Sequence, residues 1–398
     1  MTGVLIQDTL LVFAVILGIT GFGMYAEKKW KWAGLLSGMG VSIFIAIILV
    51  TIHVLPTTSQ AYDVVYDYVM PLAVPMVLVE ANAKRIIKET GRSFLLMNIA
   101  CAGAVIGGIV VGFIFRNNSF FVEDIAGYVA MEVGVCTGGA VNQAAMAQTF
   151  NVSQDVAGAA AVGSNLVAVM FLVAIGMLPN MKFFKKHFRH PYMDELEGLE
   201  TGGLEMPESE VAEEKGGFSI LGFVKLLTFS FAILGVSTLF TNFINTLSMP
   251  SALNMLLGNV YLISSLLTLV VITVFPKLGE SMKFGQDIGS FMLLLFMTVM
   301  GTGASIIEVL KIAPLIVVAE IIIVFFIGGI TLTIAKIFKM NLEEALISIN
   351  ASYGGPSTAG AYVGAKGWKR LMVPAILIGV YGYVIGNALG ILAGNLFL

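Results

Sequence analysis

The chain has 398 residues, of which 58 % are hydrophobic and 12 % charged, and its mean hydropathy is +0.93. Soluble globular chains carry about 25 % charged residues, so this composition excludes an ordinary soluble enzyme. Long apolar runs also exclude an outer-membrane barrel, whose short strands alternate polar and apolar residues. The formal net charge of -3 decides little, because in a membrane protein the positions of the charges carry the information. We therefore predict an all-α polytopic membrane protein.

Ten segments are apolar over about 20 residues, the length that crosses a bilayer as a helix. They are residues 4–25, 33–54, 63–81, 93–115, 155–178, 218–240, 254–275, 285–303, 312–335 and 371–395. The first segment lacks a basic leader and a small-residue cleavage site, so we expect a retained helix and not a signal peptide.

Two further apolar stretches, about 124–150 and 342–365, are interrupted by a pair of glycines. The interruptions read TGGAVN from residue 137 and YGGPST from residue 353. Glycine pairs and proline break helices. Each stretch is therefore either a broken crossing helix or a re-entrant hairpin that enters and leaves on one side.

The distribution of lysine and arginine separates these two alternatives. If both stretches are re-entrant, only Arg116 and Lys311 lie on one side of the membrane, Lys225 lies inside a span, and all the other basic residues share the opposite side. Those others are Lys28, Lys29, Lys31, Lys84, Arg85, Lys88, Arg92, Lys182, Lys185, Lys186, Arg189, Lys215, Lys277, Lys283, Lys336, Lys339, Lys366, Lys369 and Arg370. If both stretches crossed, the same residues would divide almost evenly. Because cytoplasmic loops collect Lys and Arg, we interpret both stretches as re-entrant, with both termini outside the cytoplasm.

A long polar segment at 181–217 divides the chain into two halves, 1–180 and 218–398. It begins basic and becomes acidic, without apolar periodicity, which indicates a flexible cytoplasmic linker. Each half has the same order of four spans, a hairpin and one more span. A shift of 216 residues carries Gly138-Gly139 onto Gly354-Gly355. Because five crossings is an odd number, the second half inserts upside down, which predicts two inverted five-helix repeats of the kind found in secondary transporters.

Three stretches carry a family resemblance: MPLAVPMVLVEANAKRIIKETGR (70–92), TGGAVNQAAMAQ (137–148) and NASYGGPSTAGAYVGAKGWKRLMVPAILIGVYGYVIGNALG (350–390). Over nearly the whole chain they resemble the bacterial membrane family catalogued as domain of unknown function 819. That family is distantly similar to the glutamate:sodium symporters and 2-hydroxycarboxylate transporters of the cation:proton antiporter/anion transporter superfamily. The resemblance implies transport by an elevator movement, a homodimer and cation coupling.

The hairpin tips are the leading candidates for binding. Half-helix N-termini at a broken segment present amides to an anionic group, and freed carbonyls can ligate Na+. The candidate residues are Thr137, Gly138, Gly139, Asn142, Gln143, Ser352, Gly354, Gly355, Ser357 and Thr358. Among these, Thr137, Asn142, Ser357 and Thr358 are the predicted Na+ ligands. The alternative is that the polar groups only satisfy the broken backbone, with the glycines as hinges.

Acidic residues inside apolar segments are costly and often functional. Glu132 lies within about two helical turns of the first tip and is a candidate cation or proton site. Glu320 is flanked by Ile and Val and needs a partner or a proton. Glu80 is either a cation or proton site like Glu132 or an interfacial residue.

Polar residues in the spans after each hairpin give a weaker signal. Ser164 and Asn165 lie in one such span and Asn387 in the other. They either line the cavity or hydrogen-bond between helices, and Asn165 is kept as a binding candidate. The two cysteines, Cys101 and Cys136, indicate neither a disulfide framework nor a metal cluster.

These features predict a secondary active transporter, with Na+-coupled symport of an amino acid, short peptide or carboxylate as the leading hypothesis. The alternative is a cation/proton antiporter in which Glu132, Glu80 or Glu320 exchanges protons for Na+. An enzyme is not expected, because we find no Ser-His, Ser-Lys, His-Glu-x-x-His or Asp/Asp constellation. We expect no cofactor beyond the coupling Na+ or H+, no nucleic-acid partner, and a homodimer in the inner or plasma membrane.

Overall fold

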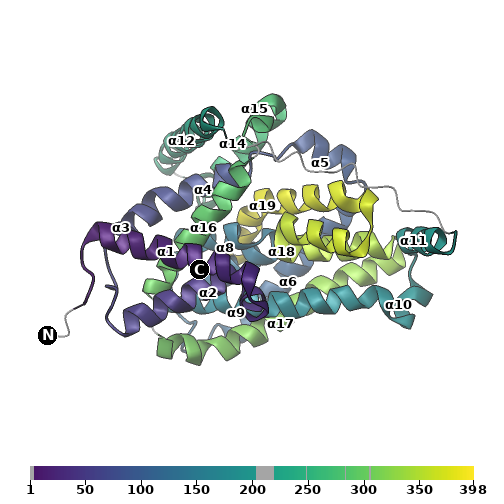
Figure 1. Ribbon diagram of the computed structural model, residues 1–398, viewed down its shortest axis with the longest axis horizontal. Helices are drawn as coiled ribbons and strands as arrows, with labels where there is room; N and C mark the ends of the chain where they lie inside the picture. The colour runs from purple at the N-terminus through teal and green to yellow at the C-terminus, as the bar shows by residue number, and fades with distance from the viewer. Residues whose placement is uncertain (1–3, 203–218, 248, 283, 304–305) are drawn as a thin grey trace.

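The computed structural model describes residues 4–202, 219–247, 249–282, 284–303 and 306–398. Within these ranges the chain is helical and contains no β-strand. In Figure 1, α12, α14 and α15 lie at one edge of the molecule and α17 at the opposite edge, with α18 and α19 between them. The structure is therefore a helical bundle, as the composition predicts.

The helices of the first half begin with α1 (Thr9–Lys29) and end with α9 (Gln154–Met177). Between them lie α2 (Lys31–Thr51), α3 (Gln60–Val64), the π-helical turn η1 (Val65–Val69), α4 (Met70–Val77), α5 (Ala83–Glu89), α6 (Arg92–Phe115), α7 (Ile125–Gly138) and α8 (Ala140–Thr149). The predicted span 63–81 is thus broken into short pieces. Helix α4 follows the π-helical turn directly; Pro71 is its second residue and Pro75 lies inside it. Because proline lacks an N–H and its ring displaces the carbonyl four residues earlier, it disrupts the regular ladder.

The second half is reached through η2 (Leu178–Asn180), α10 (Lys182–His187) and α11 (Pro191–Gly202). It then comprises α12 (Ile220–Asn245), α13 (Ser251–Leu257), α14 (Val260–Val274), α15 (Pro276–Glu280), α16 (Gly285–Thr302), α17 (Ile306–Ile337), α18 (Leu342–Lys366), η3 (Lys369–Leu371), α19 (Met372–Gly394) and η4 (Asn395–Phe397). The first part of the predicted flexible linker is therefore helical, and an ion pair between Glu195 and Arg370 ties α11 to the segment before α19. Residues 203–218 of that linker lie outside the described residues.

Among the residues that the structure describes, six helical segments are long and apolar enough to cross a membrane. They are Thr9–Lys29, Arg92–Phe115, Gln154–Asn180, Ile220–Asn245, Val309–Ile337 and Met372–Phe397. Shorter apolar helices occur at Gly38–Thr51, Ile125–Gly138 and Val260–Val274. Large apolar side chains also stand on the outside of the bundle: Leu239 on α12 is 73 % exposed and Phe325 on α17 is 72 % exposed. An apolar exterior of this kind suits hydrocarbon and not water.

Helices α7 and α8 form a helical hairpin. The chain breaks at Gly139, whose φ of 89° and ψ of -168° lie in a region open essentially only to glycine. The two limbs run antiparallel, because a Cβ at Gly127 on α7 would lie 2.3 Å from the side chain of Val152, just beyond α8. At the base, the Asp124 carboxylate accepts a hydrogen bond of 3.1 Å from the backbone N–H of Ser153. Both ends of this segment therefore lie at the same end of the bundle.

Helix α18 contains the same break, at Gly355, with a φ of 74° and a ψ of -168°. Both ends of α18 lie against the residues near and beyond the C-terminus of α9. Near its start, Glu343 accepts a hydrogen bond of 3.0 Å from the N–H of Tyr192. At its end, the Lys366 ammonium donates a hydrogen bond of 2.7 Å to the carbonyl of Gly176. This segment is a second helical hairpin.

The two hairpins open at opposite ends of α9. Ser153, which closes the first hairpin, is the N-cap of α9, whereas Gly176, which binds the second, lies near its C-terminus. Helix α9 has 24 residues, which corresponds to about 36 Å at 1.5 Å per residue. The hairpins therefore enter the bundle from opposite ends and their tips point toward its middle.

Candidate functional site

Helix α19 is the element against which both hairpin tips pack. Its glycines recur at spacings of three and four residues: Gly379, Gly382, Gly386, Gly390 and Gly394. A Cβ at Gly379 would lie 2.4 Å from the backbone nitrogen of Pro356 on the second hairpin. A Cβ at Gly382 would lie 2.3 Å from the carbonyl oxygen of Thr137 on the first. Small residues at this spacing allow backbones to approach closely, so the glycine face of α19 seats both tips.

Tyr383 on α19 lies between the two breaks. A Cβ at Gly139 would lie 3.6 Å from Cε1 of Tyr383, and a Cβ at Gly355 would lie 3.0 Å from its hydroxyl. The two glycine breaks therefore approach a single aromatic ring, and the predicted tip segments meet in space.

On the first tip, the predicted polar residues are all buried. The Thr137 hydroxyl donates to the carbonyl of Val133 on its own helix, at 2.8 Å. The Asn142 amide nitrogen donates to the carbonyl of Gly382 at 3.2 Å, while its oxygen has no hydrogen-bond partner among the described residues. Gln143 points elsewhere and donates to a hydroxyl on α9. Asn142 is thus the tip residue with an acceptor to spare.

On the second tip, the hydroxyls mainly serve the local backbone. The Ser352 hydroxyl donates to the carbonyl of Ile349 at 3.1 Å, and the Thr358 hydroxyl donates to that of Gly355 at 3.2 Å. The Thr358 side chain also fills the space beside Gly354. Ser357 is exposed. Among the described residues, no hydrogen bond joins Ser357 or Thr358 to the first hairpin, so the four predicted Na+ ligands do not form one hydrogen-bonded group.

Asn165 faces a different part of the molecule. Its amide nitrogen donates to the carbonyl of Ala161 at 2.6 Å and lies 3.5 Å from the sulfur of Met39 on α2. It therefore lies at the contact between α9 and α2, as the helix–helix alternative describes.

A buried polar cluster lies behind the first tip and joins four helices. Ser164 on α9 has its hydroxyl 3.2 Å from a carboxyl oxygen of Glu132 on α7 and 2.8 Å from one of Glu320 on α17. The other carboxyl oxygen of Glu320 accepts a hydrogen bond of 2.7 Å from the hydroxyl of Tyr353 on α18. The Cys136 thiol also lies 3.8 Å from that oxygen. Both carboxyl groups are fully buried.

The sequence did not predict several residues and contacts of the tips and of the buried polar cluster. The sequence singled out Glu132 and noted that Glu320 needs a partner, but it does not predict that the two meet. The sequence interpretation did not single out Tyr353 and Tyr383, although each adjoins a glycine and a buried tyrosine hydroxyl needs a partner. Glu80, by contrast, is exposed and lies near Arg85, which favours the interfacial interpretation.

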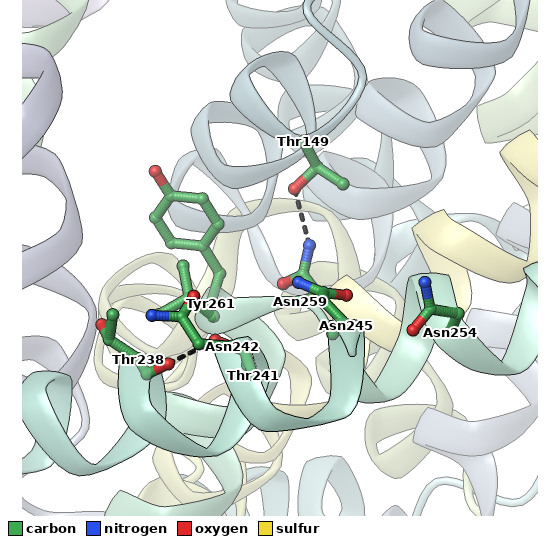
Figure 2. Close-up of a pocket in the computed structure, with 10 residues that line it drawn as sticks. Thr149, Thr238, Thr241, Asn242, Asn245, Asn254, Asn259 and Tyr261 are labelled. Atoms are coloured by element: carbon green, nitrogen blue, oxygen red, sulfur yellow. Dashed lines mark hydrogen bonds between the residues drawn. The ribbon is translucent and has the colours of Figure 1, made fainter. Parts of the chain in front are cut away.

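A separate polar hollow of about 600 Å³ lies beside the base of the first hairpin (Figure 2). Its polar lining comes from Thr149, Thr238, Thr241, Asn242, Asn245, Asn254, Asn259 and Tyr261. Thr149 is the last residue of α8 and accepts a hydrogen bond of 2.8 Å from Asn259. The lining residues carry no formal charge, and the hollow does not include the predicted tip residues.

The apolar exterior, the long apolar helices and the buried polar interior define a polytopic helical membrane protein. Within that class, the chain belongs to the family described as Protein of unknown function (DUF819), whose model matches residues 14–398. It is similar to the uncharacterized membrane protein YjcL of Bacillus subtilis (strain 168). The two are 32 % identical over 372 residues, which cover 93 % of this chain and 92 % of the relative. The family membership inferred from the three sequence stretches is thus confirmed.

Proposed function

We propose that this protein is a secondary active transporter that moves a small organic solute together with a coupling cation, Na+ or H+. The observation that carries the proposal is the pair of opposed helical hairpins whose glycine breaks meet at Tyr383. In secondary transporters, broken segments from two halves meet near the membrane midplane and form the binding site. Irregular backbone at that depth is tolerated only where protein or a water-filled cavity satisfies its polar groups. The candidate solutes are an amino acid, a short peptide and a carboxylate.

Ten crossings in two inverted repeats account for the arrangement of the helices. Gly139 and Gly355 are 216 residues apart, and both break the chain with a positive φ and a ψ of -168°. A long apolar helix follows each break, α9 in one half and α19 in the other. In this topology α2, the broken segment α3–α4, α14 and α16 supply the four crossings beyond the six long helical segments.

Labelling from one side of the membrane tests this topology. With Cys101 and Cys136 replaced by alanine, a single cysteine at Glu123 should react with an impermeant maleimide outside intact cells. A single cysteine at Lys185 should react only after permeabilisation, because it lies at the other end of α9. Reaction of both positions from the same side would contradict the opposed hairpins.

An elevator mechanism follows from a division of the bundle into two bodies. In this proposal α6, α9, α17 and α19 carry both hairpins as the moving body, and the remaining long helices form a scaffold that dimerises. Close packing inside the moving body supports it: a Cβ at Gly103 on α6 would lie 2.9 Å from the Cα of Ile327 on α17.

The carboxyl pair favours a second candidate, the cation/proton antiporter. Glu132 and Glu320 are buried together, and a carboxyl group in this setting can exchange a proton for another cation. Proton flux in proteoliposomes separates the two candidates. In an antiporter, a Na+ gradient drives protons in the opposite direction without added solute. In a symporter, cation flux requires the solute.

The solute can be found by a thermal-shift screen of metabolites with and without Na+, followed by uptake of the hits into proteoliposomes. Asn142→Ala should lower uptake at least several-fold, because it removes the tip's free amide oxygen. The control is Asn117→Ala, an exposed loop position after α6, which should transport at the wild-type rate. If no hit is taken up and no cation flux occurs with folded protein, the transporter proposal is wrong.

A further inference from the structure

The cluster around Ser164 contains more hydrogen-bond acceptors than the hydroxyl can serve. The Ser164 oxygen lies 2.7 Å from the carbonyl of Ala160, 2.8 Å from a Glu320 carboxyl oxygen and 3.2 Å from a Glu132 carboxyl oxygen. The amide nitrogen of Gln143 donates to it at 3.2 Å. A serine hydroxyl carries one proton and can therefore satisfy only one of the three acceptors.

At most one of the two carboxyl groups receives this proton, so at least one of them needs a proton of its own. Without one, its oxygen would face the lone pairs of Ser164 in a fully buried setting. The second carboxyl oxygen of Glu132 has no hydrogen-bond partner among the described residues, so nothing else there compensates a charge on Glu132. An unpaired buried carboxylate is very costly, and two neighbouring carboxylates repel each other.

The groups that surround the pair are neutral. Those that face it among the described residues are Tyr128 and Cys136 from α7, Gln143 from α8, Ser164 from α9 and Tyr353 from α18. Three of them point hydrogen-bond donors into the cluster: the tyrosine hydroxyl of Tyr353, the Cys136 thiol and the Gln143 amide. Two of these donors, from Tyr353 and Cys136, are directed at the same Glu320 oxygen and leave their hydrogens where a metal cation would have to sit, so the arrangement suits a proton better than Na+.

We propose that Glu132 and Glu320 share one proton and form the site of the coupling proton. The role of this proton in coupling rests on the proposed function. The shared proton itself does not depend on that function. The pair links the first hairpin to α17 through α9, and Tyr353 brings in the second hairpin. Loss or gain of the proton therefore changes the contacts of both hairpins at once, which is what a coupling site requires.

Infrared difference spectroscopy of the purified protein tests the shared proton without any solute. At neutral pH the wild type should show the carbonyl band of a protonated carboxylic acid, shifted in D₂O. Glu132→Gln and Glu320→Gln should each remove this band, because the remaining carboxylate then accepts from the new amide. Glu195→Gln is the control, since this exposed carboxylate is paired with Arg370 and should leave the band unchanged.

Two further measurements, on the Ser164→Ala variant and with added NaCl, complete the test of the shared proton. Ser164→Ala retains both carboxyl groups and should shift the frequency of the band without removing it, even if a glutamine variant fails to fold. Addition of NaCl at constant pH should leave the band in place. The inference is overturned if the wild type lacks the band, if Na+ removes it, or if only one glutamine variant loses it, which would place the proton on a single residue. Absence of transport in proteoliposomes with the band intact would instead refute the proposed function.

Discussion

Replacement of Gly139 by alanine tests whether backbone shape at the tip holds the first hairpin closed. The φ of 89° and ψ of -168° at Gly139 are accessible essentially only to glycine, and strain of this kind costs about 1–3 kcal/mol. Space is not the obstacle, because the new Cβ would lie 3.6 Å from Tyr383, an ordinary van der Waals contact. The cost is therefore conformational, and it corresponds to about a 5- to 140-fold change in the opening equilibrium.

The chain supplies its own probe for this measurement. Cys136 is fully buried on α7, three residues before the break. In a Cys101→Ala background, a thiol-reactive dye can label Cys136 only when the hairpin opens. When closing is faster than labelling, the labelling rate follows the equilibrium population of the open form. Gly139→Ala should therefore label about 5- to 140-fold faster than the parent protein under native conditions.

Two control variants separate this effect from general damage. Gly329→Ala lies on α17 with nothing within 4 Å of the new Cβ, and alanine favours a helix by about 1 kcal/mol over glycine. Gly91→Ala also places a side chain at a positive φ in open space, but away from the hairpin. Both should label at or below the parent rate. If Gly139→Ala labels no faster than these controls, the strained glycine does not hold the hairpin closed.

Two more predictions concern the ends of the hairpins. Asp124→Ala removes the acceptor for the Ser153 N–H, so the base of the first hairpin should lose about 1 kcal/mol of local stability; amide exchange at Ser153 should accelerate, and unchanged exchange would contradict this role. Near the second hairpin, burial lowers the pKa of His190, but hydrogen bonds to the Lys185 carbonyl and the Asp194 carboxylate outweigh burial and leave the pKa raised. Because the folded value lies above the unfolded one, the stabilisation is complete below about pH 6.5 and is lost as pH rises through the folded pKa. The protection of the amides across 190–194, taken relative to their intrinsic exchange rates at each pH, should therefore fall over that range in the wild type but not in His190→Gln.

The features that the sequence could predict are those set by local chemistry. Apolar runs predict the long helices because hydrophobic length is a local property. The glycine pairs predict interruptions, and the structure breaks at the second glycine of each pair, Gly139 and Gly355. Pro71 and Pro75 within span 63–81 are a local signal of the same kind, because proline disrupts a regular helix.

The contacts that make the site could not be predicted in this way, because they join residues far apart in the chain. The glycine spacing on α19 is visible in the sequence, but it does not say that Gly379 seats one hairpin and Gly382 the other. The meeting of Glu132 and Glu320 at Ser164 likewise depends on how α7, α9 and α17 pack. An isolated buried acid shows that a partner is needed, but not which residue supplies it.

The proposed repeats share their backbone but not their chemistry. The shift of 216 residues that carries Gly139 onto Gly355 carries Glu132 onto Ser348. Ser348 is also buried, and its hydroxyl oxygen lies 2.8 Å from the carbonyl of Glu344 and 3.1 Å from that of Ser93, so this position in the second hairpin holds no carboxyl group. The duplicated element is therefore the glycine break, which shapes both tips, while Glu132 has no acidic counterpart at the equivalent position of the second hairpin, whose buried Glu343 and Glu344 lie near its start. The shared-proton site proposed for Glu132 and Glu320 is therefore not duplicated at the second tip, and the expected coupling through this pair is one proton per chain in each transport cycle.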